Sequence, residues 1–271
     1  MNRHEAIVLA QSALEAMRIG WYPGPDRAPV DWTADLRRAL CGKVSLPPNA
    51  PLLAKVPRVG WRTDVAVTAE RTLEAARRLH EAGRRVVALN FANGMRPGGG
   101  FLHGALAQEE SLCRCSALYA VLAGDPMYAH HQVLGSPEGS DWVIYAPDVP
   151  VFRMDDGTPL ARPWLLAFIT SAAPYAPEVG QPLASNLLKR RILRVLSVAQ
   201  AYGHETLVLG AWGCGAFGHD PRQTATDFRD ALAGPFAGVF QEVVFAISDS
   251  TYDRRIIGPF REAFGGRSID D

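Results

Sequence analysis

The stretch "RVVALNFANGMRPGGGFLHGALAQEESL", residues 85–112, carries a strand signal, a loop signal and a helix signal in direct succession. The continuous apolar run at 85–91 is typical of a strand that is covered on both faces. Three successive glycines at 98–100 predict a loop. After the Gln-Glu-Glu sequence at 108–110, apolar residues recur at helical spacing. This order predicts one unit of an α/β fold.

The same alternation continues along the chain. Four further apolar runs, rich in β-branched and aromatic residues, occupy 142–147, 164–170, 206–212 and 242–248. Helical patterns lie between the runs, with apolar stripes made of Leu73, Ala76, Leu79 and Ala82, of Leu112, Cys115, Tyr119 and Leu122, and of Leu188, Ile192, Val195, Ala199 and Tyr202. We therefore expect a buried, parallel or mixed sheet between helical layers.

Helix ends are marked at several places. Thr68 is the expected N-cap of the first of these helices and Gly83 its stop. The clearest start and stop signals belong to a later helix. Asp220 is its expected N-cap, Pro221 occupies the first helical position and Gly234 follows the end.

Two segments fit the alternation less well. Residues 20–64 contain seven prolines, and we expect an irregular arm that joins an N-terminal helix to a core over 65–271. Residues 170–182 are expected to form a long loop, and loops of that length in compact domains are often functional. No shift in composition divides the chain, so we expect a single domain over residues 1–271.

Composition limits the classes of function. The 271 residues are 48% hydrophobic, enough for a substantial core. Lys and Arg total 28, as do Asp and Glu, so no net field draws the protein to a membrane or a nucleic-acid backbone. The first residues, "MNRHEAIVLAQSALEAM", do not follow a secretory pattern, and the four cysteines are expected to be free thiols of a cytoplasmic protein. The spacing of Cys113 and Cys115 does not suit zinc, and we expect neither a metal nor a cofactor.

Two glycine-rich loops each follow a predicted strand. The first is "NGMRPGGGFLHG" at 93–104, and the second is "GAWGCGAFGHD" at 210–220. Either loop alone could be a tight turn. Glycine, however, lets a ligand approach backbone N–H groups, so two such loops at one sheet favour a phosphate site built from neutral donors.

The second loop also has the spacing G-x-G-x-x-G over 213–218, which is the dinucleotide fingerprint between a strand and a helix. The fingerprint is normally followed about 20 residues later by an acid at the end of the next strand. Here that strand ends near Asp249, more than 30 residues past Gly218. An NAD-dependent oxidoreductase is therefore the weaker alternative.

Glu109 and Glu110 follow the first loop and open a helix, where acids usually complement the helix dipole at the surface. That surface role is less suitable beside a phosphate site, because the two acids would share the space with a bound anion. Consecutive helix positions differ by about 100° of rotation, so the two side chains are predicted to point in different directions and to have different tasks. One would meet the reacting bond, while the other would hold a sugar hydroxyl or position the first.

Other reactive residues offer weaker sites. Cys214 and His219 could supply a thiol nucleophile and a base, but no third group that would orient the base is evident. His130 and His131 lie in a polar stretch and are expected in solvent.

The segment "GGGFLHGALAQEE" resembles the signature of the microbial poly(ADP-ribose) glycohydrolases, a branch of the macrodomain superfamily. The segments "LNFANGMRPGGG", "SLCRCSALY" and "GAWGCGAFGHDP", and the end of the N-terminal helix at 20–22, are similar too. The resemblance covers most of the chain. It implies a three-layer α/β/α macrodomain-like sandwich with a mixed central sheet and an N-terminal helical extension.

The resemblance also implies a role for each site residue. Glu110 would be the catalytic acid, with Glu109 as its orienting neighbour and Gln108 in support. The residues implied to bind ADP-ribose are Asn93, Gly98, Gly99 and Gly100 at the first loop, and Gly213, Cys214, Gly215, Ala216, Phe217 and Gly218 at the second.

The implied reaction is hydrolysis of the glycosidic bond at the distal ribose, the one farther from the adenine. It passes through an oxocarbenium-like transition state, and one carboxyl can act first as general acid and then as general base. The expected partners are ADP-ribose and poly- or mono-ADP-ribosylated macromolecules, whether protein or nucleic acid. A non-catalytic ADP-ribose reader is a further alternative, but such a protein would need no catalytic acid.

Overall fold

A seven-stranded mixed sheet forms the centre of the protein in the computed structural model, which describes residues 1–52, 60–249 and 251–265. The strand order is β3-β6-β7-β5-β8-β9-β4. The strands of this sheet are β3 (Val44–Leu46), β4 (Asp64–Thr68), β5 (Val86–Ala92), β6 (Val143–Arg153), β7 (Pro159–Ala172), β8 (Thr206–Leu209) and β9 (Glu242–Ala246). All five strands predicted from apolar runs are confirmed, as β5 to β9.

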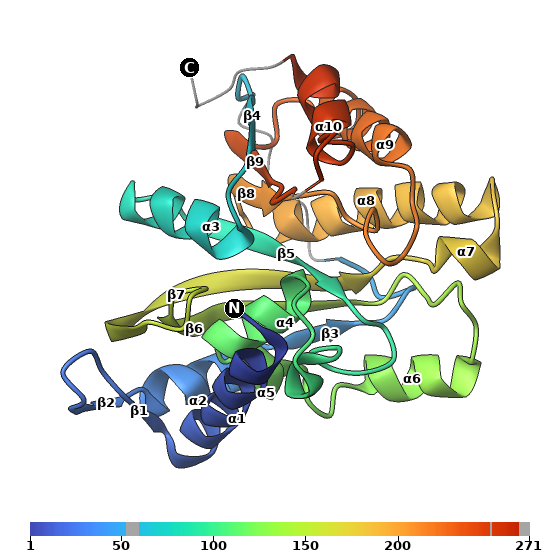
Figure 1. Cartoon of the computed structure of the whole chain (residues 1–271). Coiled ribbons are helices and arrows are strands. Elements are labelled where there is room, and N and C mark those ends of the chain that lie inside the picture. The colour runs from blue at the N-terminus through green and yellow to red at the C-terminus, as the bar shows by residue number, and fades with distance from the viewer. Residues whose placement is uncertain (53–59, 250, 266–271) are drawn as a thin grey trace.

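Helices cover both faces of the sheet (Figure 1). On one face lie α1 (Arg3–Ile19), α2 (Thr33–Gly42), α3 (Thr72–Glu81), α4 (Gln108–Cys115), α5 (Leu118–Leu122) and α6 (Pro126–Leu134). On the other lie α8 (Leu183–Ala201), α9 (Pro221–Ala233) and α10 (Ile257–Phe264), and the single turn α7 (Ala176–Val179) precedes α8. Alternate residues of β5, β7, β8 and β9 enter the two cores, as the pleat requires. The three-layer α/β/α prediction is confirmed.

The strand directions place the two glycine loops side by side. β5 pairs in parallel with β7 and with β8, and β8 pairs in parallel with β9. The carboxyl ends of these strands therefore meet at one edge of the sheet, where open α/β sheets usually bind ligands. The first loop leaves β5 there and the second leaves β8.

The predicted irregular arm over 20–64 is wrong in part. β1 (Trp21–Pro23) and β2 (Pro29–Asp31) form a hairpin, α2 follows, and β3 pairs antiparallel with β6 in the main sheet. Pro23, Pro25 and Pro29 lie in the hairpin and Pro48 lies in the turn after β3, positions that do not exclude short elements beside them. β4 was also missed, and residues 53–59 of the arm lie outside the described residues.

Two predicted helix features are corrected. Thr68 ends β4 and is not a helix cap, since α3 begins at Thr72 with Arg71 as its N-cap. The apolar stripe from Leu112 to Leu122 belongs to two helices, because Ser116 leaves the helix and bridges to Val151 of β6. In contrast, Asp220 accepts from the Arg222 N–H and caps α9 as predicted.

The segment 170–182 is shorter as a loop than expected, because β7 extends to Ala172 and α7 occupies 176–179. No helix of the described residues is long and apolar enough to cross a membrane.

Candidate active site

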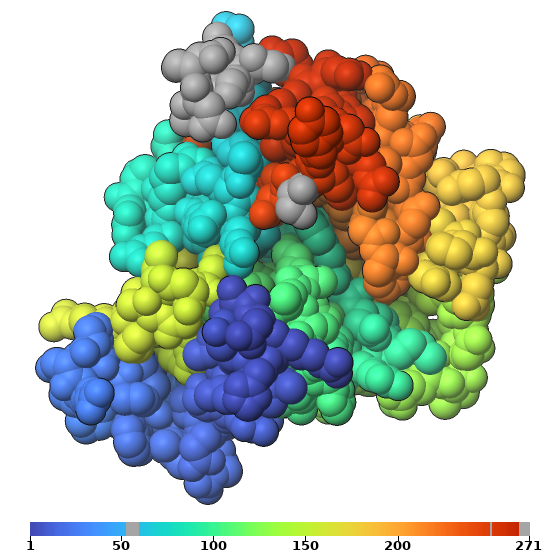
Figure 2. All heavy atoms as spheres, in the orientation of Figure 1, coloured from blue at the N-terminus to red at the C-terminus, as the bar shows by residue number. Residues whose placement is uncertain are grey.

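Two cavities open beside the glycine loops at the carboxyl edge of the sheet. Cavity I, of about 400 Å³, is lined by Asn93, Gly94, Met95, His131, Gly135, Ser136, Pro137, Gly139, Ala172, Ala173, Tyr175, Glu178, Ala216 and Phe217. Cavity II, of about 320 Å³, is lined by Arg71, Thr72, Leu73, Phe91, Leu106, Ala107, Gln108, Ser111, Leu112, Asp155, Ala211, Gly215, Ala246, Ile247, Ser248 and Ile256. In Figure 2 the surface is hollowed near its middle, where the cyan, green and red segments that border cavity II meet.

The triglycine stretch makes room for two carboxyl groups. Gly98 and Gly99 have φ angles of +69° and +56°, which side-chain-bearing residues rarely adopt. A Cβ atom at Gly99 would lie 2.5 Å from Glu110 Oε1 and 3.2 Å from Glu109 Oε2. The N–H of Gly100 donates to Glu110 Oε1 over 2.9 Å. The glycines of the first loop are therefore required by the acids that follow them in the sequence.

Glu109 is buried and bound at both oxygens. Its side chain is 3% exposed, Oε2 accepts from the Asn93 N–H over 2.7 Å, and Oε1 accepts from the Asn90 amide over 3.3 Å. Burial raises the pKa of Glu109 to about 8, although these hydrogen bonds act in the opposite direction. The folded protein therefore favours the protonated form of Glu109 near neutral pH.

Glu110 retains one unbound oxygen. The residue is 8% exposed, and its Oε1 is held by the Gly100 N–H. Within the described chain no group donates a hydrogen bond to its Oε2. A carboxyl group that is fixed at one oxygen and free at the other can exchange a proton with a ligand.

The prediction that Glu109 and Glu110 point in different directions is wrong. Their Cα–Cβ bonds diverge around the helix, but both carboxyl groups turn back to the first loop, where backbone N–H groups bind them. Long side chains can converge in this way because their remaining torsions are free to rotate. The expectation of different tasks still agrees with the different hydrogen bonding of the two groups.

Gln108 connects α4 to the end of β5. Its Oε1 accepts from the Phe91 N–H, and its Nε2 donates to the Leu89 carbonyl and to Thr72 Oγ1. Asn93 fixes the start of the first loop, because its Oδ1 accepts from the N–H groups of Met95 and Arg96. Asn93 lines cavity I and Gln108 lines cavity II, and both residues also stabilise the backbone around the acids.

The second loop offers free backbone donors. Within it, Gly213 and Gly218 have φ angles of +79° and +71° and flank residues 214–217. The N–H groups of Gly215, Ala216 and Phe217 donate to no acceptor in the part of the chain that the structure describes. Successive unpaired N–H groups attract anions. The loop also borders both cavities, since Ala216 and Phe217 line cavity I and Gly215 lines cavity II.

The thiol alternative has no geometric support. Cys214 donates to the Trp212 carbonyl, and His219 Nε2 contacts the Pro174 carbonyl over 2.9 Å. Burial also raises the pKa of the Cys214 thiol to about 12, which disfavours a thiolate.

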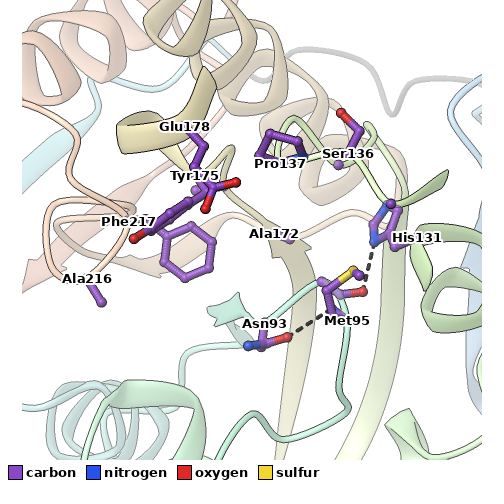
Figure 3. A pocket seen from close by; sticks show the side chains of 14 residues that line it. Asn93, Met95, His131, Ser136, Pro137, Ala172, Tyr175, Glu178, Ala216 and Phe217 are labelled. Atoms are coloured by element: carbon purple, nitrogen blue, oxygen red, sulfur yellow. Dashed lines mark hydrogen bonds between the residues drawn. The ribbon is translucent and has the colours of Figure 1, made fainter. Parts of the chain in front are cut away.

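Sequence reasoning missed several residues of cavity I. The expectation that His131 lies in solvent is wrong. Its exposed fraction is 2%, and its ring contacts the Gly94 carbonyl and Ser140 Oγ. Figure 3 shows Tyr175 and Phe217 on one side of the cavity, with His131 on another. The polar stretch gave no signal of its burial, because the partners of His131 lie in the first loop and in the segment after α6.

Comparisons with known proteins agree with this geometry. The family model described as "Microbial-type PARG, catalytic domain" matches residues 10–154. The crystal structure of poly(ADP-ribose) glycohydrolase (PARG) from Thermomonospora curvata is similar, with 40% identity and a TM-score of 0.90 over 96% of this chain and 100% of that chain. The structure of that enzyme bound to the inhibitor ADP-HPD has 42% identity and a TM-score of 0.89, again over 96% of this chain and 100% of that chain. PARG from Deinococcus radiodurans in complex with ADP-ribose has 39% identity and a TM-score of 0.77, over 84% of this chain and 96% of that chain. No curated protein matches this chain.

Proposed function

Because this chain belongs to the microbial-type PARG family, we propose that Glu110 is its catalytic acid and that Glu109 positions it. The family assignment itself makes the chain a poly(ADP-ribose) glycohydrolase, an enzyme that hydrolyses the glycosidic linkages of ADP-ribose. It confirms the resemblance found in the sequence and favours the hydrolase over both a non-catalytic reader and an oxidoreductase.

ADP-ribose has a pyrophosphate between two riboses, and the site has free N–H groups between two cavities. We assign the pyrophosphate to the N–H groups of 215–217, because those of Gly99 and Gly100 already donate to the Arg96 carbonyl and to Glu110. Cavity I then receives the distal ribose, since Asn93 lines it and its N–H is bound to Glu109. Cavity II receives the adenosine end. In this arrangement Gly98, Gly99 and Gly100 contact the distal ribose and hold the acids.

The reaction needs a proton for the leaving oxygen and an activated water. Glu110 can supply the proton from its unbound Oε2 as the anomeric carbon develops oxocarbenium character, and the resulting carboxylate can then take a proton from water. Glu109 keeps its oxygens bound to Asn90 and Asn93, so it acts by holding the first loop in place. Because Glu109 favours its protonated form, it adds little negative charge beside the pyrophosphate.

A single observation carries the proposal: both buried carboxyl groups occupy the space that Gly99 leaves open. Surface acids at a helix terminus would need neither that space nor the backbone donors that bind them.

The proposed substrates are ADP-ribosylated macromolecules, with modified protein as the main class and modified nucleic acid as a further class. We propose that residues 1–271 act as one domain, because β3 from the N-terminal arm completes the main sheet. A cytoplasmic site of action is also proposed, since all four cysteines are free thiols.

The test uses Glu110→Gln, with Glu15→Gln on the exposed face of α1 as the matched control. Each protein is incubated with poly(ADP-ribosyl)ated and with mono(ADP-ribosyl)ated protein, and released ADP-ribose is measured. We expect Glu110→Gln to lose at least about 1000-fold in rate while ADP-ribose binding changes little. Glu15→Gln is expected to match the wild type. Retention of more than a tenth of the rate by Glu110→Gln would overturn its assignment as the catalytic acid.

A further inference from the structure

Asp155 carries a buried carboxylate oxygen that no described protein group binds. The residue lies between β6 and β7 and is 9% exposed. Its Oδ1 accepts from Ser111 Oγ over 2.8 Å, whereas its Oδ2 is buried and has no hydrogen-bond partner in the described chain. Burying an unpaired polar oxygen is destabilising, and it is more so for a charged group. A side chain retained at that cost needs an explanation.

Asp155 lines cavity II, and three other polar side chains of its lining already have partners. Gln108 and Thr72, which also line this cavity, are hydrogen-bonded to each other. Ser111 donates to Asp155 itself. Asp155 Oδ2 is therefore a buried acceptor of cavity II that remains available to a ligand.

The rest of cavity II suits a nucleoside. Apolar side chains make up much of its wall: Leu73, Phe91, Leu106, Leu112, Ile247 and Ile256. Mostly apolar cavities of about 300 Å³ with a few polar groups are typical small-molecule sites. Burial raises the pKa of Asp155, while the nearby charge of Arg71 acts in the opposite direction. A ligand donor would supply the hydrogen bond that Oδ2 lacks.

We propose that Asp155 is a specificity-determining residue for the adenosine end of the substrate, where its Oδ2 accepts a hydrogen bond from the nucleoside. This inference rests on the proposed function, which assigns the adenosine end to cavity II. The donor is either the exocyclic amine of the base or the 2′-hydroxyl of the adenosine ribose. Both present an N–H or O–H group to a carboxylate oxygen.

The main variant is Asp155→Leu, which keeps the branched arrangement of side-chain heavy atoms and removes the acceptor. Two opposite effects are expected from it. The melting temperature rises, because an unpaired buried carboxylate is replaced by an apolar group. The Kd for ADP-ribose, measured by calorimetry, rises about tenfold or more because the hydrogen bond is lost. A purely structural role would not combine higher stability with weaker binding.

Two further variants sharpen the test. Asp155→Asn retains an oxygen for the ligand and an amide that can face Ser111, so its Kd is expected to stay within about threefold of the wild type. Asp156→Asn, at the exposed neighbouring position, is the matched control and should leave Kd unchanged. Asp155→Leu should also raise KM and leave kcat within about twofold, because the adenosine end lies away from the reacting bond.

Substrate analogues identify the donor. In one analogue hypoxanthine replaces adenine, and in the other the adenosine ribose lacks its 2′-hydroxyl. The analogue without the relevant donor should bind the wild type about tenfold more weakly than ADP-ribose does, and Asp155→Leu should no longer distinguish the two ligands.

Some results would overturn the inference while leaving the proposed function intact. These are an unchanged Kd in Asp155→Leu, or equal binding of ADP-ribose and both analogues by the wild type. The second measurement needs no variant, so it decides even if Asp155→Leu does not fold. The proposed function would be contradicted by a different observation, namely that the wild type releases no ADP-ribose.

Discussion

Gly99 and Glu110 occupy one shared space: a Cβ atom at Gly99 would lie 2.5 Å from Glu110 Oε1. The two residues are separated by a loop and the 3₁₀ turn η1 (Phe101–His103), yet neither can change without affecting the other. The glycines and the acids of this segment thus form one packing unit, in which the glycines admit the carboxyl groups and a backbone N–H binds one of them.

Gly99→Ala should reduce turnover much more than stability. The added methyl group displaces the Glu110 carboxyl, and small displacements of a catalytic group can cost about 100-fold in rate. Gly124→Ala is the matched control, because Gly124 has a φ of +72° and no atom within 4 Å of the added Cβ. Backbone strain should cost each variant about 1 kcal/mol of unfolding free energy. Gly99→Ala should lose somewhat more, because its methyl group also displaces a buried carboxyl. Equal rates of ADP-ribose release in the two variants would contradict the shared-space argument.

Glu109 should make the protein less stable as pH rises. Its pKa is raised to about 8 in the folded state, so its stabilising effect is complete below the unfolded pKa and is lost as pH rises through the folded pKa. Between about pH 5 and pH 8 this group should lower the unfolding free energy by roughly 2–4 kcal/mol. Urea unfolding at both pH values should show a smaller decrease for Glu109→Gln, which cannot ionise. Parallel pH profiles for the two proteins would mean that Glu109 does not titrate in this range.

His131 should act in the opposite direction. Burial lowers its pKa, so the folded protein favours the neutral ring, and the stability that this group provides is lost as pH falls below about 6.5. His131→Gln should cost about 1–2 kcal/mol at neutral pH, since the contacts to the Gly94 carbonyl and Ser140 are lost. The difference from the wild type should shrink in acid, whereas the exposed His4→Gln should follow the wild type throughout. A difference that stays constant with pH would refute this.

Phe217 should contribute to binding more than to stability. It lines cavity I half-exposed, and Tyr175 packs edge-on against it with ring centroids 6.0 Å apart. Phe217→Ala is expected to weaken ADP-ribose binding about tenfold, as calorimetry would measure, and to change the melting temperature little. Leu40→Ala, at an exposed position on α2, is the control and should leave binding unchanged. Full affinity in Phe217→Ala would exclude contact with the ligand.

Apolar runs and capping signals can be recognised in short stretches of chain, so the sequence alone predicted the elements that carry them. Apolar runs identified β5 to β9, and capping residues located α9. The arm was less predictable: α2 and β3 are short and lie among prolines, and they are stabilised by contacts with β6. Thr68 was misplaced because a threonine can cap a helix or end a strand, and its surroundings decide which.

The sequence by itself determined the order of strands β5 to β9, the two glycine loops and the acid pair, because glycine geometry and apolar periodicity act over a few residues. The tertiary structure alone decided which groups are paired. It turned both carboxyl groups toward Gly99, paired the N–H groups of Gly99 and Gly100, left those of 215–217 unpaired, and placed Asp155 beside Ser111. Burial and hydrogen-bond partners arise from segments that meet only in the fold, so pKa values and free acceptors follow from the packed structure.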